Sequence, residues 1–188
     1  MYNLPYYHPY YYFYNDQPAY SPYRSFPIYQ PEPLWVAPDA FDEDRQRQQL
    51  KDYGPEPFVI NIEEAAERNR NFRTALWTGK HFQITLMSLR PGEDIGLEMH
   101  PNVDQFLRIE QGQGIVRMGK ERNNLNFVRR VHEDYAIVVP AGTWHNLTNT
   151  GNEPLKLYSI YAPPNHPHGT VHQTKAAALA AEEHHNQR

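Results

Sequence analysis

The sequence predicts an all-β domain, a sandwich or barrel flanked by two short helices. Between Phe72 and Ala162 the chain contains about nine short apolar segments separated by turn signals of Gly, Pro or Asn. Many short strands with close turns are typical of sandwiches and barrels rather than of βαβ units. Helical patterns occur only before and after this region. No repeat at a fixed period is visible, so we expect a single barrel.

The length and composition are those of one domain with an appended segment. The chain has 188 residues, 39% of them hydrophobic and 21% charged, which suffices for one core. Cysteine is absent, and this excludes disulfides, thiolate zinc sites and a Cys nucleophile. The formal net charge is −4 and Lys and Arg are not clustered, so we expect no nucleic-acid partner.

Nothing in the sequence indicates a membrane or secretion signal. No apolar run approaches the ~18 residues of a membrane helix. Met1–Pro5 has neither the basic nor the apolar region of a signal peptide. We therefore expect a cytoplasmic protein that has no signal peptide and binds no membrane.

The composition divides the chain into four segments. We predict a disordered Tyr/Pro-rich tail over residues 1–33, a linker over 34–57, a barrel over 58–172 and a C-terminal helix over 173–188. Ten of the 14 tyrosines lie in the first 30 residues and seven of the 17 prolines in the first 33. Proline at this density prevents helices and interrupts sheets. Tyrosine rings suit contacts with proteins, so the tail is either dispensable or docks the domain onto coat or assembly proteins.

Both flanking helices have capping signals. Asn61, with Glu64 three residues later, forms a capping-box pattern and predicts a helix from Ile62 to about Arg70. Thr174 is placed to cap a last helix from Lys175 to about His185. Two further short elements are expected before the barrel, a surface helix at Phe41–Asp52 and a strand at Phe58–Ile60.

The expected strands are rich in β-branched and aromatic residues. They are Phe72–Trp77, His81–Leu89, Ile95–His100, Gln105–Glu110, Gly114–Met118, Phe127–Val131, Tyr135–Val139, Trp144–Asn149 and Leu155–Ala162. A single small barrel leaves edge strands and apolar faces that a second copy can cover, so we expect a homodimer.

Four side chains are candidates for a metal site. Glu98 and His100 are two apart in an expected strand and therefore face the same side. The chain then turns, so that Gln105 on the returning strand can lie beside them, and His145 follows a second turn. Two imidazoles, one carboxylate and one amide oxygen suit a single divalent Fe, Mn, Ni or Zn ion. Taken alone, Glu-x-His is more often a surface pair; the joint spacing is what favours a site.

These residues lie in two spaced motifs. The first runs from Gly92 over five residues to Glu98-Met99-His100, then over four to Gln105 and over six to Gly112. The second is Pro140-Ala141-Gly142-Thr143-Trp144-His145 followed three residues later by Asn149. Both resemble the two motifs of the cupin superfamily. Over about residues 58–172 the resemblance implies a double-stranded β-helix, or jelly roll, with one metal ion in its mouth.

The motifs depart from the family pattern in three places. Glu98 stands where the family has the first His, and Gln105 stands where it has Glu. The set still contains one anionic ligand, so we expect metal binding with altered geometry; the alternative is a cupin that has lost its metal and binds a ligand through the barrel alone. Asp104 is an alternative oxygen ligand, although adjacent strand residues face opposite ways. The opening Gly of the second motif is replaced by Asp134.

Longer strings resemble small bacterial single-domain cupins that are often labelled phosphomannose-isomerase-like. The strings are Gly96–His100, Asp104–Phe106, Ala136–Asn146 and Leu157–Pro164. This resemblance implies a metal-dependent enzyme of isomerase, decarboxylase or dioxygenase type that acts on a small polar or carboxylated substrate. The Tyr/Pro tail resembles tracts of spore-coat proteins in composition, and so a non-catalytic protein tethered to a coat is the alternative.

Three weaker sets of candidates remain. His166, His168 and His172 follow the last expected strand, and His172 is a candidate acid or base near the metal. Trp144 is a candidate wall of the substrate pocket. Arg73 and Arg108 could bind an anionic substrate, but nothing in the sequence selects them over the other arginines.

Overall fold

A computed structural model describes residues 49–185, with side chains to residue 181. The predictions for the Tyr/Pro-rich tail, for most of the linker and for nearly all of the surface helix at Phe41–Asp52 lie outside the described residues. Across residues 49–185, none of the helices has the length and apolar character to cross a membrane.

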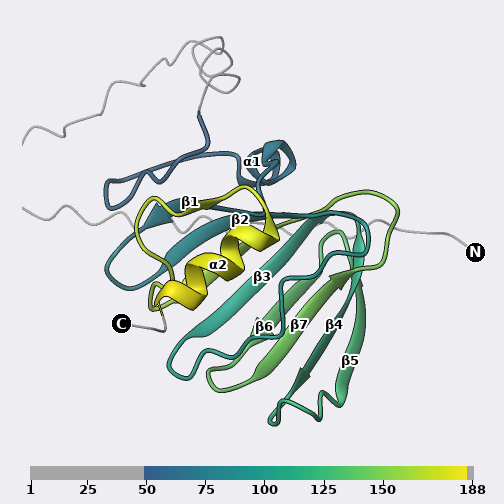
Figure 1. Cartoon of the computed structure of the whole chain (residues 1–188). Helices are drawn as coiled ribbons and strands as arrows, with labels where there is room; N and C mark the ends of the chain where they lie inside the picture. Colours follow the sequence, from purple (N-terminus) through teal and green to yellow (C-terminus); the bar gives the residue numbers. More distant parts are fainter. Residues whose placement is uncertain (1–48, 186–188) are drawn as a thin grey trace, which may run out of the picture. The chain divides into compact units, whose positions relative to one another are not determined.

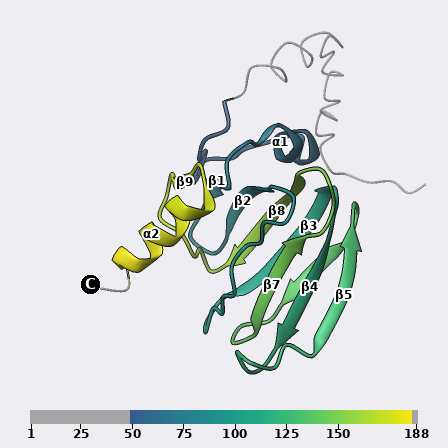
Figure 2. The ribbon, with the colours of Figure 1, turned by 45° about the vertical axis from the view of Figure 1, so that its right-hand side comes forward.

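The described chain is built from two antiparallel sheets, as Figures 1 and 2 show. The strands are β1 (Arg73–Thr78), β2 (Gln83–Leu89), β3 (Asp104–Gln111), β4 (Gln113–Gly119), β5 (Phe127–His132), β6 (Ala136–Val139), β7 (Trp144–Asn149), β8 (Leu155–Ala162) and β9 (Val171–His172). One sheet has the order β6-β3-β8-β2-β1-β9 and the other β5-β4-β7. This arrangement confirms the predicted all-β barrel with short flanking helices.

The interior changes from polar to apolar along the strands. Near one end, Tyr161 of β8 lies between Gln83 of β2 and Gln105 of β3, and all three side chains are buried. Two rows further along, the inward residues of the same strands are all apolar: Met87, Leu157 and Ile109. The apolar end forms the main hydrophobic core, where these side chains need no hydrogen-bond partners. The polar end is where a site can be built.

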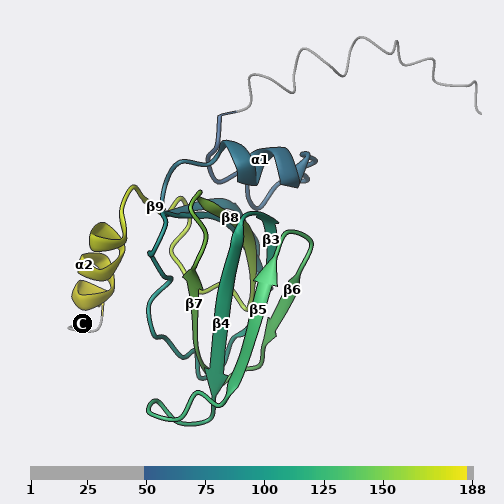
Figure 3. The same cartoon turned by 90° about the vertical axis from the view of Figure 1, so that its right-hand side faces the viewer.

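A second apolar cluster covers the outer face of the larger sheet. Helix α1 (Ile62–Arg68) begins at Asn61, whose side chain accepts a hydrogen bond from the Glu64 backbone, as the capping pattern predicts. Its residues Ala65 and Ala66 are fully buried and pack with side chains of β1 and β2. Strands β1 and β2 are therefore buried on both faces, and in every view α1 lies over the same end of this sheet (Figures 1–3).

Helix α2 (Lys175–His185) follows the short strand β9, which pairs with β1. Thr174 caps the helix, as predicted, because its hydroxyl accepts a 3.2 Å hydrogen bond from the Ala177 backbone. Ala178 is buried in the main core. Figures 2 and 3 show α2 beside β9, at the edge of the larger sheet. Strand β9 was not predicted, because two residues are too short to show a pattern.

The expected strand Ile95–His100 is not a regular strand, and this prediction is wrong in detail. The segment runs antiparallel to β7 but pairs with it only at isolated bridges, one at Asp94 and one at Glu98. Gly96 lies between them with φ +99°, a value outside the β region, and so interrupts the ladder. The alternation of residues did not reveal this break.

The expected strand Phe58–Ile60 is also absent, since this segment has no strand assignment in the structure. The Phe58 ring instead stacks on Tyr53, with ring centroids 4.2 Å apart. Its apolar residues belong to the outer cluster rather than to a sheet. An apolar run of three residues is explained equally well by either environment.

Asp134 occupies a position that needs a left-handed backbone. Its φ is +69°, which explains why the related motif has Gly there. Asp tolerates this region better than most residues. Its carboxylate also accepts a 2.6 Å hydrogen bond from Arg108, so the substitution keeps the turn and adds a contact.

Asn149 closes the apolar end of the barrel and is only 1% exposed. Its amide donates hydrogen bonds to the backbone carbonyls of Leu89 and Glu153 at 3.0 and 2.8 Å, and its oxygen accepts one from Gly151 at 2.8 Å. One side chain therefore joins the end of β2 to the turn between β7 and β8.

Asn149→Ala should lower the free energy of unfolding by about 2–4 kcal/mol, because it leaves buried backbone groups without partners. Urea denaturation followed by circular dichroism measures the change. The matched control is Asn152→Ala in the same turn, an exposed position where a change within about 0.5 kcal/mol is expected. Equal stability of the two variants would contradict the role given to Asn149.

Candidate metal centre

Three of the four predicted ligands converge at the polar end of the barrel. One oxygen of Glu98 lies 3.6 Å from Nε2 of His100 and 3.4 Å from Nε2 of His145. The ligand atoms of the three residues all lie within 4.8 Å of one another. The side chain of His145 is 1% exposed, whereas Glu98 and His100 retain 17% and 14% exposure. The cluster is therefore recessed, although parts of the Glu98 and His100 side chains reach solvent.

Backbone hydrogen bonds hold these residues in place. Glu98 and His145 form a mutual antiparallel pair, with N–H to O=C distances of 3.1 and 2.9 Å. The Gly142 backbone N–H donates to the carbonyl of His100 at 2.8 Å. Each ligand is thus positioned by main-chain contacts between the segment 94–100 and the turn that leads into β7. This explains how His100 and His145, which are 45 positions apart, come together without a regular strand ladder.

The hydrogen bond of His145 Nδ1 determines whether Nε2 is free to bind a cation. Nδ1 lies 2.9 Å from the carbonyl oxygen of Thr143, which can only accept, so Nδ1 carries the hydrogen. In the neutral ring Nε2 then presents a lone pair toward the carboxylate of Glu98. Two acceptors facing each other at 3.4 Å require a cation between them, either a proton or a metal ion. A backbone carbonyl holding a ligating imidazole in this way is common at metal sites.

The three candidate ligand atoms form no other hydrogen bonds to the described side chains. Within the described side chains, Oε1 of Glu98 and Nε2 of His100 and His145 are buried without a hydrogen-bond partner. Burial raises the pKa of Glu98, but the neighbouring imidazoles and the guanidinium of Arg73 lower it more strongly, so it stays well below its usual range. The carboxylate is therefore ionised, as a ligand must be. These residues fit a divalent ion.

Gln105 lies in the same interior, opposite Tyr161 of the neighbouring strand β8. It is 2% exposed on β3, and its side-chain Nε2 donates a 3.0 Å hydrogen bond to the Ser159 hydroxyl. Its Oε1 is buried and has no hydrogen-bond partner among residues 49–181. Its coordination of a metal stays a prediction.

Two of the remaining sequence candidates, Asp104 and Trp144, lie apart from this cluster. Asp104, the alternative oxygen ligand, faces the other side of β3 and caps the next turn by accepting from the Ala141 backbone at 2.8 Å. Trp144 faces away from His145, and the guanidinium of Arg122 lies 5.5 Å from its ring centroid. His172 lies on β9 opposite Arg73. The structure thus does not bring Asp104 or Trp144 to the metal cluster.

Comparison with known proteins agrees with this fold. The sequence profile described as "Cupin domain" matches residues 85–161. The crystal structure of BH2720 from Bacillus halodurans is similar, with 67% sequence identity and a TM-score of 0.69. The match covers 98% of the BH2720 chain and 69% of this one. The chain belongs to the cupin superfamily.

Two relatives of this cupin are similar over most of their own length. Over 134 residues it is 76% identical to the uncharacterized protein YrkC of Bacillus subtilis strain 168, which is 71% of this chain and 72% of YrkC. Over 115 residues it is 43% identical to the uncharacterized protein L612 of Acanthamoeba polyphaga mimivirus, which is 61% of this chain and 70% of L612. Neither name states an activity.

The cupin interior contains a buried cation that sequence reasoning did not select. Arg73 is 1% exposed; its charge lowers the pKa of Glu98 and opposes the burial that raises the pKa of Tyr161, so it lies near both. The signal in the sequence was weak, because Arg73 begins a strand that is buried on both faces and shows no alternation. Only the packing shows that it belongs to the barrel interior.

His166 was one of three histidines in a candidate loop, and it is the one that reaches the barrel interior. Its ring packs edge-on against Tyr161, with centroids 5.0 Å apart. The side-chain amide of Gln83 binds both the N–H and the carbonyl of His166, at 3.0 and 2.9 Å. Burial, and then the charge of Arg73, lower the pKa of His166 to about 3. His168 is exposed and contacts the Gly54 carbonyl instead.

Replacing Gln105 tests whether its oxygen is a ligand. Gln105→Leu should weaken the binding of Mn²⁺ or Zn²⁺ by about tenfold, whereas Gln105→Glu should strengthen it, because the same atom becomes anionic. Competition with a chromogenic chelator measures both affinities. The same two substitutions at Gln113, which is exposed on β4, are the control and should change nothing. Unchanged affinity in Gln105→Leu would remove this residue from the ligand set.

The buried neutral His166 makes stability depend on pH. Its folded pKa of about 3 lies below the ordinary 6.5, so the unfolded chain binds the extra proton between these values. In metal-free protein, acidification from pH 6 to 4 should therefore cost up to ~1.4 kcal/mol per pH unit more in the wild type than in His166→Gln. Denaturant titrations at each pH measure the difference. Parallel pH profiles of the two proteins would show that His166 is not held neutral.

Proposed function

We propose that this cupin is a metal-dependent enzyme that acts on a small polar or carboxylated molecule. The observation that carries the proposal is the set of buried ligand atoms without partners, which lies beside a buried guanidinium at the open, polar end of the barrel. Buried polar atoms without partners are costly, and they cluster where a ligand satisfies them. An isomerase, a decarboxylase and a dioxygenase are all compatible with such a site.

Glu98, His100 and His145 would hold the ion, with Gln105 as a fourth ligand. When bound, an Fe, Mn, Ni or Zn ion supplies a Lewis acid for a substrate oxygen, and iron adds chemistry with O2. The protein's part is to leave room for substrate. The partial exposure of Glu98 and His100 supports access to that side of the cluster.

Arg73 favours a substrate with a carboxylate or another oxyanion. A guanidinium binds a carboxylate through paired hydrogen bonds, and burial strengthens the attraction because water does not screen it. Its charge lowers the pKa values of both Glu98 and His166, which supports a position near the metal cluster and near the loop that carries His166. A substrate oxyanion on Arg73 would be oriented with its neighbouring atoms toward the cluster.

Two neighbouring groups are suited to hydrogen bonding with a substrate. Burial raises the pKa of Tyr161, so its hydroxyl stays protonated and can donate a hydrogen bond. Burial lowers the pKa of His166 to about 3, so its ring is neutral and can accept a hydrogen bond. The Tyr161 ring lies edge-on to both His166 and His100, at 5.0 and 5.8 Å between centroids. The interior thus contains a donor and an acceptor within reach of one small substrate.

The alternative is a non-catalytic protein tethered to a spore coat or another assembly by its Tyr-rich tail. Composition alone supports it, because ten of the 14 tyrosines lie in the first 30 residues. Homodimerisation also stays a proposal. It is supported by exposed apolar side chains on the edge strands β5 and β6, among them Val138 at 63% exposure.

His145→Ala tests the enzymatic proposal. Elemental analysis of protein purified without added metal should give about one divalent ion per chain, and the variant should lose it together with at least ~100-fold of the turnover of a carboxylated substrate. His81→Ala, at an exposed turn, is the control. Arg73→Lys keeps the charge but not the paired geometry and should raise KM about tenfold for carboxylated substrates only.

The opposite results favour the tethered scaffold. Protein that lacks metal when produced in several hosts, or turnover that is unchanged in His145→Ala, would overturn the enzymatic proposal. Deletion of residues 1–33 separates the two functions, because it should leave turnover intact and abolish only localisation to an assembly.

A further inference from the structure

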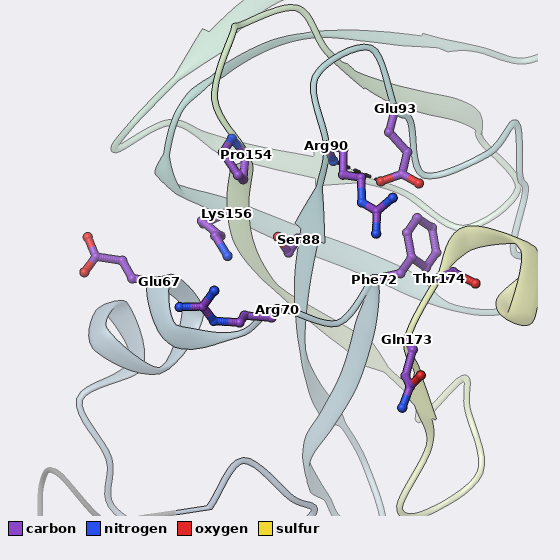
Figure 4. Close-up of a pocket in the computed structure, with 10 residues that line it drawn as sticks. All are labelled: Glu67, Arg70, Phe72, Ser88, Arg90, Glu93, Pro154, Lys156, Gln173 and Thr174. Atoms are coloured by element: carbon purple, nitrogen blue, oxygen red, sulfur yellow. Dashed lines mark hydrogen bonds between the residues drawn. The ribbon is translucent and has the colours of Figure 1, made fainter.

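A second cavity lies outside the barrel, on the outer face of the larger sheet. It has a volume of about 410 Å³ and lies between the end of α1, the loop after β2 and the connection from β9 to α2 (Figure 4). Ser88 and Lys156 form its floor; they are cross-strand partners on β2 and β8, and their neighbours in sequence face the barrel core. This cavity shares no residue with the metal cluster.

The floor contains a buried cation without an ionic partner. Lys156 is 7% exposed, and its ammonium group donates to the backbone carbonyl of Asn69. Within residues 49–181 no carboxylate lies at ion-pair distance from it. Burial and then the charge of Arg70 lower the pKa of Lys156, and the charge of Glu67 opposes them in part. In Figure 4 the positive groups of Lys156 and Arg70 lie on the same side of the cavity. Such an arrangement is costly unless an anion joins it.

Two more cations border the same space. Arg70 and Arg90 are exposed at the rim, and neither forms an ion pair with any described side chain. Glu67 and Glu93 also line the cavity, but in Figure 4 they lie at opposite ends, with the three cations between them. One oxygen of Glu93 already accepts a 2.9 Å hydrogen bond from the Arg90 backbone. The middle of the cavity is therefore positively charged.

We propose that this outer cavity binds the dianionic phosphate group of a small molecule. Arg70, Arg90 and Lys156 supply N–H donors from separate sides, which suits a tetrahedral oxyanion better than a planar carboxylate. The Ser88 hydroxyl on the floor adds a donor between them. The volume lies in the range of small-molecule pockets, so the ligand is larger than the phosphate group alone. The proposal does not depend on the metal centre.

Calorimetric titration of the full-length protein with inorganic phosphate and with glycerol phosphate, at constant ionic strength, tests this. Saturable binding of both is expected, with succinate at least tenfold weaker. Arg70→Gln and Arg90→Gln should each weaken phosphate binding by about tenfold, since each removes a charged hydrogen bond. Arg117→Gln, which removes one equally exposed charge on β4, is the matched control and should bind as the wild type does.

Two further variants separate the cavity from other sources of binding. Lys156→Met should abolish phosphate binding; because it can also destabilise the fold, the two arginine variants decide the result if it does. His145→Ala should leave phosphate binding unchanged, which excludes the barrel as its location. Absence of saturable binding, equal losses in Arg117→Gln, or loss in His145→Ala but not in Arg70→Gln would each overturn the proposal.

Discussion

The site depends on one antiparallel backbone pair, between Glu98 and His145. These two residues exchange both main-chain hydrogen bonds, and their side chains meet on the interior side of that pair. The pair is isolated, because Gly96 breaks the ladder on one side and the chain turns on the other. A regular strand would leave both positions in a continuous sheet. The break lets the segment bend inward, so that His100 reaches the same point.

The second constraint is the polarity of the barrel interior. A small barrel has a single packed core, and here the apolar rows of β2, β3 and β8 supply it at one end. The other end therefore contains buried polar side chains at a cost in stability, as functional sites in stable folds commonly do. Arg73, Tyr161 and His166 all lie at that end. The apolar core provides the stability that this polar end does not.

The sequence predicts the fold and the proximity of Glu98, His100 and His145. It does not predict which other side chains surround these three residues. Alternation, turns and capping residues predict most strands and both described helices, because these signals are local. The spacing of the two motifs brings His100 and His145 together. The burial of Arg73 is not visible in the sequence, where it is one of two arginine candidates, because β1 is buried on both faces and shows no alternation. The placement of His166 depends on how one loop folds back, which no periodicity encodes.

The contact between Gln83 and the loop of His166 has a consequence beyond positioning. The amide of Gln83 binds the main-chain N–H and carbonyl of residue 166, as a neighbouring strand would. It recognises peptide groups only and is indifferent to the side chain that the loop presents. Gln83 can therefore hold this loop whatever side chain residue 166 carries. The side chain at position 166 can change during evolution while the contact with Gln83 is kept.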